Sequence, residues 1–264
     1  MKKWIAISSL AAVIIVIAAS FLLESFGPDE ERTPVGLYMK SQEYLQEGEL
    51  EKAEEALQKA IDMDPRTHYY LRFAMGKLQE QKGNFEKALQ NYKAAREVSS
   101  EDPEVNRRAG KMAQKLGRIK EAIAYYEKAH EHASEDLSVL YQLGYFYTLQ
   151  RRLDLAEQVY KKIISLAYDE VQAYKNLAFV YAEKGKTDKA VKSLQKAVEL
   201  EPGYAEAYND LGNLMMIQKK YEKAVNMFKK ALEIKPGYED AASNLERAKK
   251  KLEKESTGSS DSEQ

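Results

Sequence analysis

A column of small residues that recurs every 34 positions constrains this chain more than any other feature. Alanine fills one column, with steps of 34 after a first step of 35: Ala53, Ala88, Ala122, Ala156, Ala190 and Ala224. Two further columns keep the same steps: Ser41, Gly76, Gly110, Gly144, Ala178 and Gly212, and Ala60, Ala95, Ala129, Ile163, Ala197 and Ala231. Self-similarity at such a period is typical of repeat proteins, so the sequence predicts six stacked units.

The last unit, residues 205–238, shows the local structure most clearly. Its apolar residues form two sets at steps of three and four, which predicts two amphipathic helices. Pro236 and Gly237 then stop the second helix, because proline cannot continue a helix and glycine accepts a left-handed backbone. A helical hairpin of this kind cannot bury two apolar faces alone, and it therefore needs neighbouring hairpins.

Aromatic residues or leucine fill the position four after the first alanine of each unit: Leu57, Tyr92, Tyr126, Tyr160, Leu194 and Phe228. With these columns, residues 34 to 238 resemble the tetratricopeptide repeat (TPR) family, whose 34-residue pattern has Leu-Gly, Tyr, Ala, Phe or Tyr, Ala and Pro at matching places. The resemblance implies an all-α fold, a right-handed α-solenoid of six hairpins. The expected units are 34–68, 69–102, 103–136, 137–170, 171–204 and 205–238.

Composition excludes several functions. The 41 basic and 42 acidic residues give a net charge of −1, which argues against general nucleic-acid binding. The chain has no cysteine, so disulfides, thiolate metal sites and cysteine nucleophiles are excluded. Its 3 histidines lack metal-ligand spacing, and no phosphate loop or nucleophile motif is present. We therefore predict no enzyme activity, no catalytic residues, no metal and no cofactor.

The N-terminal residues predict a membrane anchor. Residues 4–23 contain no charge and no proline, and as a helix they match the thickness of a bilayer's hydrocarbon. Lys2 and Lys3 precede this stretch and acidic residues follow it, so residues 1–3 are expected in the cytoplasm and the repeats on the outer (periplasmic or extracellular) side of the cell membrane. Residues 24–33 are expected to be a linker. A cleaved secretory signal is the alternative interpretation of the same stretch.

After the last unit we expect a capping helix over residues 239–254 and a disordered tail over 255–264. The helix would place Ala242, Leu245, Ala248 and Leu252 on one face and charges elsewhere, as a terminal cap requires. The tail has no apolar residue.

An apolar stripe on the first helix of the fourth unit is not needed for packing between hairpins. The resemblance implies that this side of the first helices lines a concave peptide-binding groove. The predicted partner-binding residues are Phe73, Arg107, Lys111, Tyr141, Tyr145, Leu149, Lys175, Phe179, Asn209, Asn213 and Met216. They combine apolar rings, a basic section in the third unit and amides, which suits a segment with apolar and acidic side chains. Ordinary solvated surface is the alternative interpretation of these residues.

Together these features predict a single-pass, membrane-anchored scaffold that binds a protein or peptide in its groove, in assembly of an envelope or secretion complex. The alternatives are a secreted or periplasmic adaptor after signal cleavage, and a structural protein that self-associates. Binding of chaperone C-termini through a carboxylate clamp is disfavoured, because Phe179, Glu206 and Asp210 stand where the resemblance requires amides or bases.

Overall fold

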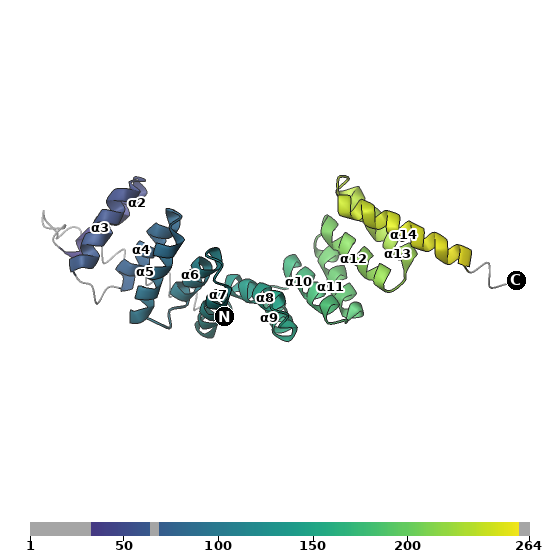
Figure 1. Cartoon of the computed structure of the whole chain (residues 1–264), viewed down its shortest axis with the longest axis horizontal. Helices are drawn as coiled ribbons and strands as arrows, with labels where there is room; N and C mark the ends of the chain where they lie inside the picture. Colours follow the sequence, from purple (N-terminus) through teal and green to yellow (C-terminus); the bar gives the residue numbers. More distant parts are fainter. Residues whose placement is uncertain (1–32, 64–68, 259–264) are drawn as a thin grey trace. The chain divides into compact units, whose positions relative to one another are not determined.

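In the computed structural model, residues 33–63 and 69–258 are described, and every regular element within them is a helix (Figure 1). The helices form six hairpins followed by a single helix: α2 (Pro34–Gln46) with α3 (Leu50–Met63), α4 (Tyr69–Gln81) with α5 (Phe85–Val98), α6 (Pro103–Lys115) with α7 (Ile119–His132), α8 (Leu137–Leu149) with α9 (Leu153–Leu166), α10 (Val171–Glu183) with α11 (Thr187–Leu200), α12 (Ala205–Ile217) with α13 (Tyr221–Ile234), and α14 (Glu239–Gly258).

The predicted membrane span, residues 4–23, lies outside the described residues, as do residues 1–3 and nearly all of the 24–33 linker. Within 33–63 and 69–258, no helix combines the length and the apolar character that crossing a bilayer requires.

Local sequence explains where several helices begin. The Thr33 hydroxyl accepts a hydrogen bond from the Gly36 amide at 3.0 Å, and proline follows as the first helical residue. Asp102 caps α6 in the same way, accepting from the Val105 amide at 2.9 Å. Each cap satisfies an amide that has no partner within its own helix, and proline loses nothing there because its position needs no donor.

The turn inside each hairpin requires a left-handed residue. Glycine provides it at Gly48, Gly83, Gly117 and Gly185, with φ between 69° and 79°. The equivalent residues of the α8–α9 and α12–α13 hairpins are Arg151 (φ 57°) and Lys219 (φ 58°). A side chain is costly in this conformation, so these two turns are less favourable than the glycine turns.

The repeat columns form the core. All six residues of the first alanine column have no exposed surface, and the same holds for the column from Ala60 to Ala231. In four hairpins an aromatic ring lies where a glycine lacks a side chain: a Cβ on Gly76 would be 2.6 Å from the Tyr92 ring, and one on Gly144 would be 2.7 Å from the Tyr160 ring. The other two hairpins have a leucine in place of the ring, with Ser41 or Ala178 in place of the glycine. Within the chain, a hairpin that has the glycine therefore also has the aromatic ring, and a hairpin that lacks the glycine has leucine instead of the ring.

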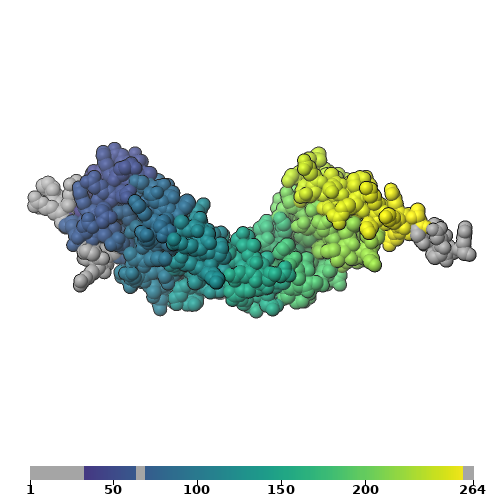
Figure 2. Space-filling view, viewed as in Figure 1, coloured from purple at the N-terminus to yellow at the C-terminus, as the bar shows by residue number. Residues whose placement is uncertain are grey.

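Contacts divide the chain into two compact units: Met1–Ala129, with α2 to α6 and most of α7, and His130–Gln264, with α8 to α14. Within the second unit each hairpin lies against its neighbours in sequence, and the surface colour changes gradually from α8 to α14 (Figure 2).

An equivalent lysine–glutamate pair occurs at two of the junctions between hairpins. Lys82 contacts Glu54 at 2.6 Å in the first unit, and Lys184 contacts Glu157 and Asp154 in the second. The exposed fractions of the Lys184 and Glu157 side chains are only 14% and 12%. Burial by itself would raise the pKa of Glu157, but hydrogen bonds from Lys161 and Lys184 outweigh it and lower the pKa to about 2.

The last helix differs from its prediction in length and in phase. It continues to Gly258, past the predicted end at residue 254, and the Ser256 and Thr257 hydroxyls donate to the Glu253 carbonyl in this last turn. The first four residues assigned to a disordered tail are therefore helical. Ala242 is exposed, and Ala241 is buried in its place together with Ala248. The helix does pack on α13 and α12, as a cap should.

Candidate interaction surface on the first helices

The predicted binding residues other than Met216 belong to three sets of equivalent positions, or columns, on the first helices of the hairpins. The first column is Phe73, Arg107, Tyr141, Lys175 and Asn209; the second is Lys77, Lys111, Tyr145, Phe179 and Asn213; the third is Gln81, Lys115, Leu149, Glu183 and Ile217. Adjacent columns are four residues apart, so their side chains lie along one side of each helix.

In the second unit the first column is engaged with the element that follows. The Tyr141 hydroxyl donates to Glu170 at 2.9 Å, and the Lys175 ammonium lies 5.4 Å from the centre of the Tyr204 ring. Burial, and then the hydrogen bond to Glu170, raises the pKa of Tyr141. Asn209 is only 5% exposed and accepts a hydrogen bond from Asn244 of α14 at 3.0 Å. Asn209, one of the predicted binding residues, is therefore covered by α14.

Phe73 holds the first column in the first unit. Its ring stacks on Tyr69 with 6.0 Å between centroids, and the Arg108 guanidinium lies 5.7 Å from its centroid. Phe73 is half-buried by these neighbours.

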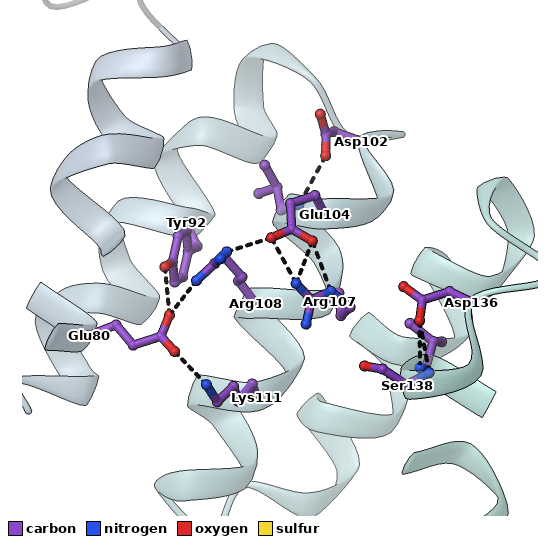
Figure 3. Close-up of polar contacts among 11 residues, drawn as sticks. Glu80, Tyr92, Asp102, Glu104, Arg107, Arg108, Lys111, Asp136 and Ser138 are labelled. Carbon is purple, nitrogen blue, oxygen red and sulfur yellow. Dashed lines mark hydrogen bonds and ion pairs between the residues drawn. The ribbon is translucent and has the colours of Figure 1, made fainter. Parts of the chain in front are cut away.

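The basic section of the third hairpin is paired with acidic residues (Figure 3). Glu80, whose side chain is 14% exposed, accepts from Lys111 at 2.6 Å, from Arg108 at 3.0 Å and from the Tyr92 hydroxyl at 2.9 Å. Burial opposes the charge on Glu80, but the bonds from Lys111 and Tyr92 prevail and its pKa is lowered.

Glu104 completes this network by accepting from both Arg107 and Arg108. The sequence identified the positive charges of this section correctly, but it did not identify the carboxylates that neutralise them. Arg107 and Lys111 are therefore engaged within the unit.

The second and third columns of the second unit are apolar and open. The exposed fractions are 50% for Tyr145, 58% for Leu149, 55% for Phe179 and 66% for Ile217. On α8, by contrast, Leu140, Leu143 and Tyr147 are buried. Four large exposed apolar side chains on one side of three successive first helices are unusual for a surface without a partner.

A cavity of about 200 Å³ lies between α10 and α12, below two of these side chains. Leu194 and Leu214 contribute apolar wall, and Lys175, Asp210 and Asn213 contribute polar groups. Burial raises the pKa of Asp210. The structure therefore brings three of the predicted residues together at one cavity, Lys175, Phe179 and Asn213, and adds Ile217 to them.

Met216 lines a different cavity, which the sequence did not indicate. It has a volume of about 340 Å³ and lies between α12 and the basic side of α14, with Arg247, Lys250, Lys251, Glu253 and Lys254 as its other lining residues. A larger cavity of about 640 Å³ lies between α11 and α13, over Tyr208, Leu211 and Met215 of α12. Within the described residues, no group of three or more His, Cys, Asp or Glu side chains could hold a metal ion.

Four profiles of the tetratricopeptide repeat family match the chain, over residues 36–67, 73–135, 113–178 and 169–236. These matches cover most of the chain and decide its family. Residues 36–67 and 73–236 are tetratricopeptide repeats. None of the curated proteins compared matches the chain.

Solved structures of TPR proteins share the fold. YrrB, described as a TPR protein with an unusual peptide-binding site, is 25% identical, with a TM-score of 0.64 over 72% of this chain and 97% of YrrB. MamA is 26% identical, with a TM-score of 0.60 over 64% of this chain and 92% of MamA. A TPR protein from Cytophaga hutchinsonii reaches a TM-score of 0.69 over 89% of this chain and 94% of its own, but at 20% identity it supports the fold alone.

Proposed function

We propose that this TPR protein is an interaction scaffold that binds a peptide segment of a partner protein along α8, α10 and α12. One observation carries the proposal, namely the exposure of Tyr145, Leu149, Phe179 and Ile217 beside the cavity between α10 and α12. Aromatic and aliphatic side chains of this kind are enriched at the centres of protein interfaces. Repeats of this family typically serve as non-enzymatic scaffolds, and YrrB is itself described as having a peptide-binding site.

The same observation defines the chemistry of the bound segment. An apolar side chain of the partner enters the cavity between Phe179 and Ile217, while Asn213 and Lys175 offer a donor each to its backbone or polar groups. The remaining exposed side chains, Tyr145 and Leu149, extend the contact along α8.

We further propose that residues 4–23 anchor the scaffold in the cell membrane, with the repeats on the outer side, where it takes part in assembly of an envelope or secretion complex. This part of the proposal rests on the uncharged N-terminal stretch and the charges around it. The full-length protein should then stay with membranes through a carbonate wash, whereas a soluble form that lacks residues 4–23 would contradict the anchor.

Site-specific photocrosslinking tests the binding surface. A benzophenone amino acid replaces Tyr145 in one variant and Phe179 in another, and an equally exposed residue of a second helix, Lys229, serves as the control. We expect both surface variants to give the same adduct with one protein in the cells that produce this chain, and the control variant to give none. Adducts of equal yield at Lys229, or none at Tyr145 and Phe179, would refute the proposal.

A further inference from the structure

The C-terminal helix α14 carries an exposed basic surface next to the proposed binding surface. Arg247, Lys250, Lys251 and Lys254 line its cavity against a single carboxylate, Glu253. All four basic side chains are exposed. The protein as a whole has a net charge of −1, so this local excess of positive charge is not a consequence of composition.

Three of these basic residues, Lys250, Lys251 and Lys254, differ from the basic residues of α6 because their ammonium groups are not bonded to a carboxylate, although Glu253 lines the same cavity. The side-chain ammonium groups of Lys250, Lys251 and Lys254 form no hydrogen bond or ion pair with any residue in 33–63 or 69–258, whereas Lys111 and Arg108 both bind Glu80. The α14 lysines therefore retain their capacity to bind an anionic group.

The basic cavity and the apolar cavity lie on either side of one helix. Ile217 lines the cavity between α10 and α12, and its sequence neighbour Met216 lines the cavity between α12 and α14. A segment that fills the first cavity and continues past the end of α12 therefore reaches the α14 lysines. Asp210 sits in the first cavity and disfavours an acidic side chain there, so the acidic part of the segment belongs on α14.

From this arrangement we propose that the partner segment is an acidic peptide with one bulky apolar residue, which enters the α10–α12 cavity while the adjoining carboxylates bind Lys250, Lys251 and Lys254. The inference rests on the proposed function, because it extends the same surface. Charge complementarity, together with the shared wall formed by Met216 and Ile217, favours a peptide over other anions. Met216 gives the basic cavity an apolar floor, which suits the stem of a glutamate side chain better than an inorganic ion.

Defined peptides test the inference on the full-length protein. One fluorescein-labelled probe joins Gly-Phe to Ser-Gly-Glu-Glu-Asp-Glu, and a second has glutamine and asparagine in place of the acids. Each probe is made in both orders, with either half at the N-terminus. Fluorescence anisotropy gives Kd at several salt concentrations. We expect the acidic probe, in one of its two directions, to bind about tenfold more tightly than its amide counterpart, since a few exposed ion pairs of modest strength add to roughly that factor.

Two sets of variants locate the effect. Replacement of Lys250, Lys251 and Lys254 by serine should remove the tenfold preference and flatten the salt dependence of the acidic probe. The control variant removes the same amount of charge from exposed positions on second helices, by serine at Lys120, Lys162 and Lys229. It should leave the preference for the acidic probe and its salt dependence within about twofold of the parent. Circular dichroism should show equal helicity in both sets.

The outcomes separate the inference from the proposed function. If the amide probe binds and depends on Phe179 and Ile217, but the acids add nothing, the binding surface stands and the acidic partner is refuted. If Phe179→Ser with Ile217→Ser leaves binding of both probes unchanged, the proposed function fails as well. Binding of neither probe, or retention by phosphatidylglycerol vesicles through the lysines without peptide binding, also overturns the inference.

Discussion

The α4–α6 region of the first unit and the α8–α12 region of the second share one packing frame but have opposite surfaces. Both place a glycine under an aromatic ring, as in Gly76 with Tyr92 and Gly144 with Tyr160. In the first region Arg108 and Lys111 bind Glu80. In the second region four surface positions are apolar and 50% exposed or more, namely Tyr145, Leu149, Phe179 and Ile217. This difference shows that the repeat pattern determines how the helices pack. The surface that can bind a partner depends on positions that the repeat pattern does not specify.

The shared frame should be equally intolerant of an added side chain in both regions. Gly144→Ala and Gly76→Ala each place a Cβ against a ring, and we expect each to lower the free energy of unfolding by about 1 to 3 kcal/mol. Thermal and urea denaturation measure the loss.

A compensating variant makes this prediction specific. Gly144→Ala with Tyr160→Leu reproduces the pair Ala178 and Leu194 found in the α10–α11 hairpin, and it should recover at least half of the loss. If the double variant is less stable than Gly144→Ala alone, the exchange of ring and glycine is not a packing effect.

The charged surface of the first region should be structural. Glu80→Ala leaves Arg108, Lys111 and Tyr92 without their shared acceptor, and we expect it to cost about 2 kcal/mol of stability. Glu183→Ala in the second region removes only the pair with Arg151, whose side chain is 70% exposed, and should cost less than about 0.5 kcal/mol. Equal losses in urea denaturation would remove this distinction between the regions.

The hairpin junction within the second region should respond to acid. The pKa of Glu157 is lowered to about 2, below its value in an unfolded chain, so its contribution is complete above pH ~4.5 and declines as the pH falls toward 2. We expect the parent to lose about 1 kcal/mol more than Glu157→Gln over this range, because solvent screens part of the interaction. If the free energy of unfolding of the parent and of Glu157→Gln changes equally with pH, the ion pairs of Glu157 do not stabilise the protein.

Sequence predicted the frame because the frame repeats. The alanine columns and the apolar sides of the helices follow from periodicity alone, and every residue of the alanine columns is buried. The pairing of Lys111 with Glu80 was not predictable in this way, since the two residues stand in different columns of successive repeats and only their three-dimensional placement brings them together. The cover over Asn209 was not predictable for a related reason, because Asn244, which donates to it, is a residue of α14 and lies outside the repeats.

The central claim is that the exposed apolar positions of the second unit bind the partner and the paired charges of the first do not. The direct test is isothermal titration calorimetry with the partner that photocrosslinking identifies. Its affinity is measured for two double variants, Tyr145→Ser with Phe179→Ser and Arg107→Gln with Lys111→Gln. We predict that the first pair weakens binding by about 2 kcal/mol, or roughly thirtyfold in Kd, with unchanged helicity, and that the second changes Kd less than about threefold. The opposite ranking, with both proteins folded, would contradict the account.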